Sequence, residues 1–161
     1  MGMNETCLNS AAQANAQQAS CTGGFELACS ADTAFPLFSP EGERAWAVGW
    51  DPQPVFPDQI VFERNTVFRL GTGNEEAIWT ILDADWHTHR AEYVRLAPAS
   101  HTARIVVQVD PLGVDRCHVT VSYVVTAFGA QAPAQLEPFS EASYAERMLS
   151  WRAQIQACLK G

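Results

Sequence analysis

Two aspartates and two histidines occupy every second position from Asp83 to His89, a spacing that could support metal chemistry. In an extended strand, alternate side chains lie on one face, so Asp83, Asp85, His87 and His89 could converge. Carboxylate oxygens and imidazole nitrogens together bind several transition metals. Alternatively, residues 85–88 form the turn between two strands, which removes the shared face. We favour the turn and predict no metal site.

Other residues of catalytic type lack the partners that their chemistry needs. His118 and Ser122 lie four positions apart on a predicted strand, which separates them by about 13 Å. A nucleophile requires a base within hydrogen-bond contact. The sequence Gly71-Thr72-Gly73 lacks the strand-to-helix context of a dinucleotide-binding loop and instead predicts a hairpin turn. We therefore predict no catalytic residue and no cofactor.

Tyr93 and Arg95 share one face of a predicted strand that runs from His89 to Leu96. If this face looks into the protein, Arg95 places a fixed positive charge there. A buried arginine must be paired with an acidic group or meet an anionic ligand. In the alternative, Arg95 faces solvent and has no such role. The sequence leaves both possibilities open.

Composition narrows the class of protein. The chain has 161 residues, 47% of them hydrophobic and 17% charged, which is typical of one folded domain. The net charge of −8, with only ten Lys and Arg residues, argues against nucleic acid and anionic membrane surfaces as partners. Apolar runs are far shorter than the ~20 residues of a membrane span. Five cysteines without a Cys-x-x-Cys pair favour free thiols in the cytoplasm.

The order of expected elements begins with a flexible tail over residues 1–22, followed by one domain over residues 23–161. A strand starts at Phe25, and a short helix starts at Ser30 and is limited by Pro36. Ser39 then caps a second short helix. Strands are expected over residues 67–71, 77–83, 89–96, 102–110 and 116–128, with a further strand over residues 59–63.

The C-terminal segment changes to a helical period. Apolar residues recur at steps of three and four, which predicts one amphipathic helix over residues 139–159. The residues of this stripe are Tyr144, Met148, Trp151, Ile155 and Leu159. Successive strands with short turns predict an antiparallel sheet, and the helix would cover its concave face. The space between a bent sheet and a straight helix becomes a core, a pocket or both.

Several stretches of the chain resemble the START-like or SRPBCC superfamily, including its bacterial polyketide cyclase/dehydrase-like members. They are residues 35–46 (FPLFSPEGERAW), 49–52 (GWDP), 79–81 (WTI), 93–96 (YVRL) and 121–127 (VSYVVTA). The resemblance spans residues 23–160 and implies the α+β helix-grip fold, a curved antiparallel sheet of six to seven strands around a long C-terminal helix. The superfamily includes lipid carriers, cyclases and co-chaperone modules.

We expect the chain to bind a hydrophobic small molecule, lipid-like or polyketide-like, inside this fold. The expected ligand-binding residues are Trp79, Tyr93, Arg95, Tyr123, Met148 and Trp151. Their aromatic rings could equally belong to the core, because each buries a large apolar area. Two alternatives remain: a cyclase or dehydratase acting in the same cavity, with Tyr93, Arg95 or Asp83 as its acid or base, and a protein-interaction module without a ligand.

Overall fold

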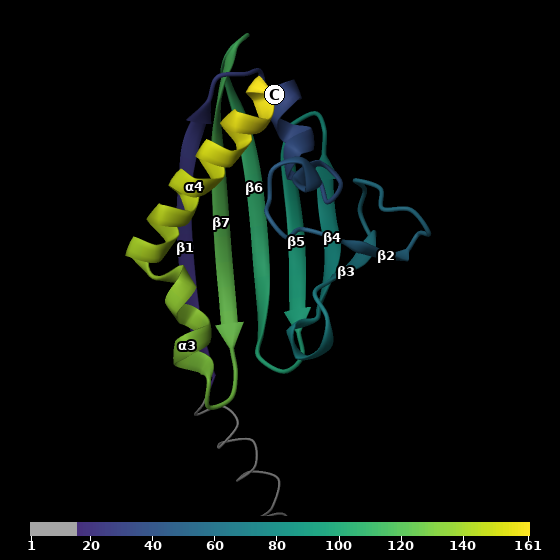
Figure 1. Cartoon of the computed structure of the whole chain (residues 1–161), viewed down its shortest axis with the longest axis vertical. Coiled ribbons are helices and arrows are strands. Elements are labelled where there is room, and N and C mark those ends of the chain that lie inside the picture. Colours follow the sequence, from purple (N-terminus) through teal and green to yellow (C-terminus); the bar gives the residue numbers. More distant parts are fainter. Residues whose placement is uncertain (1–15) are drawn as a thin grey trace, which may run out of the picture.

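The computed structural model of this chain describes residues 16–161 and contains one antiparallel sheet (Figure 1). Among these residues the sheet has seven strands in the order β1-β7-β6-β5-β4-β3-β2. The strands are β1 (Gln17–Leu27), β2 (Gln53–Phe56), β3 (Val67–Leu70), β4 (Ala77–Asp85), β5 (Arg90–Ala97), β6 (His101–Gly113) and β7 (Arg116–Ala127). Strands β2 to β7 form a meander, and β1 closes the order by pairing with β7.

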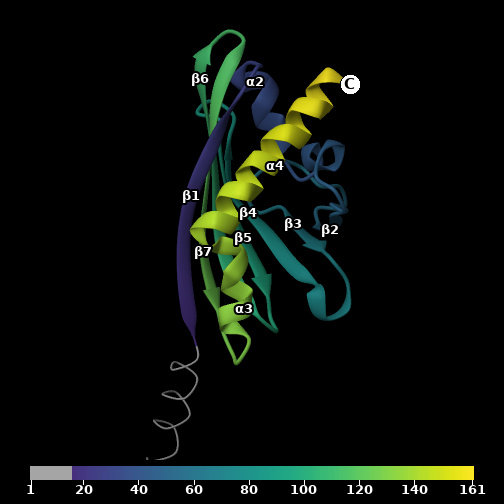
Figure 2. The ribbon, with the colours of Figure 1, turned by 60° about the vertical axis from the view of Figure 1, so that its left-hand side comes forward.

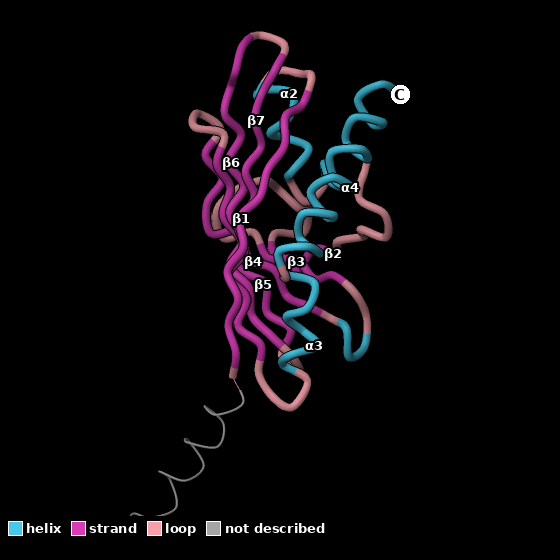
Figure 3. The backbone as a smooth tube through the Cα atoms, turned by 90° about the vertical axis from the view of Figure 1, so that its left-hand side faces the viewer, coloured by secondary structure: helices cyan, strands magenta, loops and turns pink. Residues whose placement is uncertain are grey.

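One long helix lies against the sheet, and short helices fill both ends of it (Figures 1 and 2). The α-helices are α2 (Ala31–Ala34), α3 (Ala132–Leu136) and α4 (Glu141–Lys160). The 3₁₀ helices are η1 (Phe35–Phe38), η2 (Gly42–Ala45), η3 (Gly73–Glu75) and η4 (Glu137–Phe139). Seen along the sheet, α3 and α4 lie on the same face of it (Figure 3). This arrangement is the α+β helix-grip fold expected from the sequence.

Alternation along the central strands separates the two faces of the sheet. In β7, the odd-numbered residues from Cys117 to Ala127 are buried, whereas the even-numbered ones are partly exposed. The neighbouring strand β6 buries Ala103, Ile105, Val107 and Val109 in the same way. Because side chains on a strand point alternately to opposite faces, this pattern places one apolar face under α4. The sequence predicted these two strands over residues 102–110 and 116–128.

Serine caps begin two of the helices. The Ser140 hydroxyl accepts a hydrogen bond from the Ser143 backbone N–H at 3.3 Å, and α4 starts at the next residue. Ser30 accepts one from the Thr33 N–H at 3.1 Å and starts α2. Each cap satisfies a backbone donor that has no partner within its helix. The expected starts at Ser30 and near Ser140 are confirmed.

The first strand begins earlier than the sequence analysis predicted. Residues 17–22, expected to be part of a flexible tail, pair with β7 as the first half of β1. The Gln18 Nε2 donates to Thr126 Oγ1 at 2.9 Å, and the hydroxyls of Thr22 and Ser122 lie 3.0 Å apart. Because these side chains are polar, the sequence pattern did not indicate a strand here. The strand lies at the edge of the sheet and pairs along its length with β7. Residues 1–15 of the expected tail lie outside the described residues.

The strand predicted over residues 59–63 is wrong. Strand β2 lies at Gln53–Phe56 instead, and residues 59–63 form an irregular loop. The apolar residues that suggested a strand anchor this loop to the core: the Phe62 ring centroid lies 5.1 Å from that of Phe35 and 6.5 Å from that of Tyr93. Between residues 16 and 161, no helix is both long and apolar enough to cross a membrane.

Replacing Ile155 by alanine should strongly destabilise the fold. Ile155 is fully buried on the α4 face that packs on the sheet, so its truncation leaves a cavity and should cost about 2–5 kcal/mol of unfolding free energy. Leu149 on the same helix is 66% exposed, and Leu149→Ala should change stability by less than about 0.5 kcal/mol. Urea unfolding of both variants measures the difference. Equal costs would show that α4 does not pack as described.

Candidate functional site

A cavity of about 820 Å³ lies between the sheet, α4 and the segment around η2. This volume is within the range of pockets that hold small organic ligands. Its wall contains Glu43, Trp46, Ala47, Trp50, Leu70, Gly71, Asn74, Glu75, Ala77, Trp79, Tyr93, Arg95, Ala97, Ala99, Ser100, His101, Ile105, Val107, Tyr123, Gln131, Gln135, Pro138, Phe139, Arg147 and Trp151. Apolar and aromatic side chains make up most of this wall.

The cavity opens at the end of the sheet where three turns meet. Asn74 and Glu75 in η3, Ala99 in the β5–β6 turn and Gln131 before α3 are exposed lining residues. In contrast, Tyr93, Ile105 and Val107 are buried further along the strands. The mouth is therefore polar and the interior apolar.

Five of the six predicted ligand-binding residues line this cavity. They are Trp79, Tyr93, Arg95, Tyr123 and Trp151. Met148, the sixth, does not line it: it is buried in the core, where an added Cβ on Gly23 would lie 2.9 Å from its Cγ. The helical stripe is wide, and Met148 is on the side of α4 that faces β1. We therefore correct the prediction for Met148 to a packing role.

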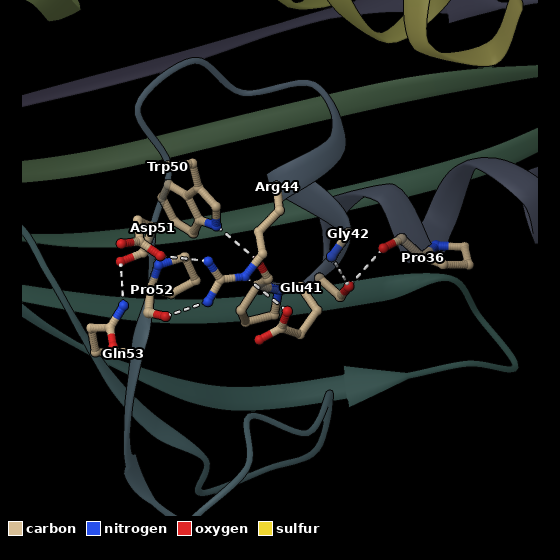
Figure 4. Close-up of polar contacts among 10 residues, drawn as sticks. Pro36, Glu41, Gly42, Arg44, Trp50, Asp51, Pro52 and Gln53 are labelled. Carbon is tan, nitrogen blue, oxygen red and sulfur yellow. Dashed lines mark hydrogen bonds and ion pairs between the residues drawn. The ribbon is translucent and has the colours of Figure 1, made fainter. Parts of the chain in front are cut away.

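The segment from Ser39 to Gln53 closes one side of the cavity and is fixed by an arginine outside it (Figure 4). Arg44 Nε donates to Glu41 Oε2 at 2.8 Å, Nη1 to Asp51 Oδ1 at 2.6 Å, and Nη2 to the Pro52 carbonyl at 2.5 Å. These bonds tie both ends of the segment together. As a result, the intervening side chains are presented to the cavity in a fixed arrangement.

Two tryptophans of this segment donate hydrogen bonds to backbone carbonyls that precede them in the chain. Trp46 Nε1 donates to the Leu37 carbonyl at 2.7 Å, and Trp50 Nε1 donates to the Pro40 carbonyl at 2.8 Å. Their rings then form part of the aromatic wall: Trp46 lies edge-on to Trp151 at 5.4 Å between centroids, and Trp50 to Trp79 at the same distance. Polar tips paired with backbone leave the apolar faces available for a ligand.

Tyr93 and Tyr123 both line the cavity, but only the Tyr93 hydroxyl has a hydrogen-bond partner in the described structure. The Tyr93 hydroxyl donates to the Phe38 carbonyl at 2.7 Å, and burial raises its pKa well above the usual value. Burial also raises the pKa of Tyr123, against the opposing effect of Arg95 and Arg147. Both phenols remain protonated at neutral pH, so neither serves as a general base there.

Arg95 faces the cavity, which decides the question left open by the sequence. Its guanidinium carbon lies 5.3 Å from the Trp79 ring centroid, a cation–π arrangement. Among the described residues, no ion pair or hydrogen bond involves this guanidinium, and its Nε is buried without a partner. Burial lowers the pKa of Arg95. The cavity therefore contains a partly desolvated cation that has no acidic partner among the described residues.

Sequence analysis missed Glu43, a cavity-lining acid on η2. Desolvation raises the pKa of its carboxyl group well above the usual value. The carboxylate in turn raises the pKa of Tyr93 and, to a lesser extent, of Tyr123. The sequence showed Glu43 only as an acidic residue in the first turn of a short helix, a position usually explained by the helix dipole.

His101 and Arg147 were also missed. His101 begins β6, its Nδ1 lies 2.8 Å from the Ser100 hydroxyl, and its Nε2 is buried without a partner. Arg147 lies on α4 three residues after Tyr144, with its guanidinium carbon 4.7 Å from the Phe139 centroid. The helical stripe could have indicated Arg147, because residues three apart share a helix face.

The candidates that the sequence analysis set aside lie outside the cavity. Asp85 accepts hydrogen bonds from the backbone N–H groups of His87 and Thr88 at 2.9 and 3.2 Å, which confirms the expected turn. Asp83 pairs with Arg64 at 3.1 Å, so it is not a cavity acid. His118 and Ser122 lie on the outer face of the sheet, away from α4.

Comparison with solved structures identifies several with the same arrangement. Norcoclaurine synthase from Thalictrum flavum matches with a TM-score of 0.62 at 14% identity, over 90% of each chain. The Zhui aromatase/cyclase from Streptomyces sp. R1128 matches with a TM-score of 0.64 at 13% identity, over 88% of this chain and 93% of that one. A Thermobifida fusca protein matches with a TM-score of 0.63 at 17% identity, over 85% and 92%.

No protein-family model and no curated protein matches the sequence. At identities of 13–17%, the structural similarity establishes the fold and leaves the activity to be argued from the cavity. The neighbours include both a synthase and an aromatase/cyclase, so they do not agree on one reaction. The chain therefore shares the helix-grip fold of these structures.

Proposed function

We propose that this protein binds a hydrophobic small molecule in the cavity under α4. The observation that carries the proposal is an interior space of about 820 Å³ whose deep wall is aromatic and aliphatic. Transfer of a ligand's apolar surface from water to such a wall is favourable by ~25 cal/mol per Å². Because the segment from Ser39 to Gln53 is held by the hydrogen bonds of Arg44, it should lose little conformational freedom when a ligand binds.

The alternative of an interaction module without a ligand has less support. Such a module needs no interior space, and protein cores are ordinarily close-packed. Here a space of about 820 Å³ connects to solvent through a polar mouth. The solved structures of similar fold also include norcoclaurine synthase from Thalictrum flavum in complex with dopamine and hydroxybenzaldehyde.

The neutral dye N-phenyl-1-naphthylamine tests the proposal directly. Its emission rises and shifts to shorter wavelength when it leaves water, and we expect saturable binding of one dye per chain. Ala97→Trp should lower the affinity tenfold or more, because Ala97 is buried in the cavity wall near the mouth. Leu96→Trp is the matched control, since Leu96 is exposed and outside the cavity wall.

Absence of dye binding to the wild-type protein would overturn the proposed function. Equal affinities of the Ala97→Trp and Leu96→Trp variants would show that the dye binds elsewhere. Circular dichroism of both variants confirms that each is folded before the affinities are compared.

A second candidate function, acid–base catalysis in the same cavity, is favoured by Glu43 alone. A general acid needs a pKa near the working pH, and burial moves that of Glu43 in this direction. The carboxyl group reaches the cavity, where a bound molecule would lie against it. This candidate concerns what happens to the ligand and leaves the binding proposal unchanged.

The ionisation of Glu43 should appear in the pH dependence of stability. Because burial raises its folded pKa above the unfolded value, its favourable contribution is complete below the unfolded pKa and is lost as pH rises through the folded pKa. Glu43→Gln cannot ionise. The variant's unfolding free energy, relative to wild type, should therefore increase with pH across that interval.

Urea unfolding at a series of pH values measures this difference. Glu146→Gln, at an exposed position on α4, is the matched control and should show no such trend. A difference between Glu43→Gln and wild type that does not vary with pH would contradict a buried, ionisable Glu43.

We further propose a cytoplasmic location, as the cysteine content suggested. Among the described residues, Cys21, Cys29, Cys117 and Cys158 are all free thiols. Free thiols are typical of a reducing compartment.

A further inference from the structure

Three nitrogen atoms in the cavity wall are buried without a hydrogen-bond partner. They are Trp79 Nε1, Arg95 Nε and His101 Nε2, and in residues 16–161 no other side-chain nitrogen or oxygen is in this condition. All three residues line the same cavity. Buried polar groups in native proteins are almost always paired, so a cluster of unpaired ones requires an explanation.

The three residues lie on adjacent strands near the mouth of the cavity. Trp79 on β4 is the register partner of Arg95 on β5. Ala97, two residues after Arg95, is the register partner of His101 on β6. Desolvation and the positive charge of Arg95 both lower the pKa of His101. The three residues are therefore neighbours in the wall of one cavity.

This site presents hydrogen-bond donors. The indole N–H and the guanidinium can only donate. Burial and Arg95 keep His101 neutral, and when the Ser100 hydroxyl donates to Nδ1, the proton of the ring is on Nε2. A ligand that satisfies these groups must bring acceptor oxygens, and a cationic ligand head group is excluded by Arg95.

The charge of Arg95 indicates that the acceptor is anionic. Removing a cation from water is costly unless an opposite charge compensates it. Glu43 and Glu75 are the carboxyl groups of the wall, but burial disfavours the charged form of Glu43 and Glu75 is exposed at the mouth. Neither forms an ion pair with Arg95 in the described structure. Arg147, the other arginine of the cavity wall, differs from Arg95 because its guanidinium has a hydrogen-bond partner: Nη2 donates to the Pro138 carbonyl at 2.9 Å.

We propose that the cavity ligand is an apolar acid whose carboxylate binds at the subsite formed by Trp79, Arg95 and His101. This inference rests on the proposed function and adds the chemical class of the ligand. The apolar body would extend from this subsite toward Ile105, Val107 and Trp46, away from the mouth. The carboxylate would supply the opposite charge and the acceptors that the wall lacks.

Decanoate and 1-decanol, which share a ten-carbon chain and differ in the head group, test the subsite. Each is titrated against the protein with bound N-phenyl-1-naphthylamine at neutral pH, where decanoate is ionised. We expect decanoate to displace the dye at a concentration about tenfold or more below that of decanol, the ratio given by one hydrogen bond to a charged group. Without the subsite, the more strongly hydrated carboxylate would bind more weakly, and the protein's net charge of −8 would repel it.

Arg95→Met removes the charge and preserves the apolar stem of the side chain. In this variant, the ratio of the decanol concentration to the decanoate concentration needed to displace the dye should fall about tenfold. The dye and decanol should still bind. Arg116→Met is the matched control: Arg116 is exposed at the β6–β7 turn, with a carboxylate of Glu26 3.9 Å away, and its removal changes net charge equally. If Arg95→Met does not fold, Arg95→Lys replaces it and should show a reduced but measurable preference.

The outcomes separate the two proposals. Failure of the wild-type protein to bind the dye would overturn the cavity function itself. Dye binding with decanol equal to or better than decanoate would leave that function intact and overturn the carboxylate subsite. A decanoate preference that persists in Arg95→Met and in Arg95→Lys at the wild-type ratio would overturn the assignment to Arg95.

Discussion

The structure depends on how closely α4 approaches the sheet at one side. Gly23 on β1 lies directly beneath this helix, and a Cβ there would lie 2.9 Å from both Tyr144 and Met148. The Tyr144 hydroxyl donates to the Val121 carbonyl at 2.6 Å and fixes the same contact. A straight helix held closely against β1 and β7 cannot also contact the opposite side of a bent sheet. The cavity is the space that this geometry leaves open.

The segment from Ser39 to Gln53, which contains η2, forms the side of the cavity that α4 does not cover. It covers the part of the sheet beyond the reach of the helix, and Trp46 meets Trp151 of α4 edge-on across the gap. Arg44 sits outside the cavity and joins Glu41 to Asp51 at the base of this segment. Thus a surface ion-pair network positions interior aromatic groups, and the shape of the cavity depends on residues that no ligand would touch.

Sequence patterns predicted those parts of the fold in which burial follows a simple period. The strand-like runs of β6 and β7 and the stripe on α4 placed these elements to within a few residues, because each element has one buried face. Residues 17–22 were missed because only small side chains, those of Ala19 and Cys21, pack against the core there, and the neighbouring residues are polar. Ile60 and Phe62 led to the wrong strand prediction over residues 59–63, because a loop that packs apolar side chains against the core can have the composition of a strand.

The same limit explains which site residues were found. The part of the aromatic wall formed by Trp79, Tyr93, Tyr123 and Trp151 was predicted, because large apolar side chains on inward positions indicate an interior, whether or not it is filled. Trp46, Trp50 and Phe139 were not predicted to line it. Glu43 and His101 lie at element ends and Arg147 lies on the long helix α4, and a surface role is the usual explanation for charged or titratable residues at such positions. Only the three-dimensional structure shows that their side chains face a common space. The polar character of a cavity is therefore harder to predict than its apolar character.

Arg95 shows why the function must be argued from individual residues. Proteins that share this fold at 13–17% identity differ in what they are named for, so the fold alone does not select a ligand. The partly buried guanidinium of Arg95 lies against Trp79 without an acidic partner among the described residues, an arrangement that is costly for the empty protein. Such a cost is typical of groups arranged for a molecule that arrives later. The apolar wall explains why a ligand would enter, and the uncompensated cation explains which end of it would be held.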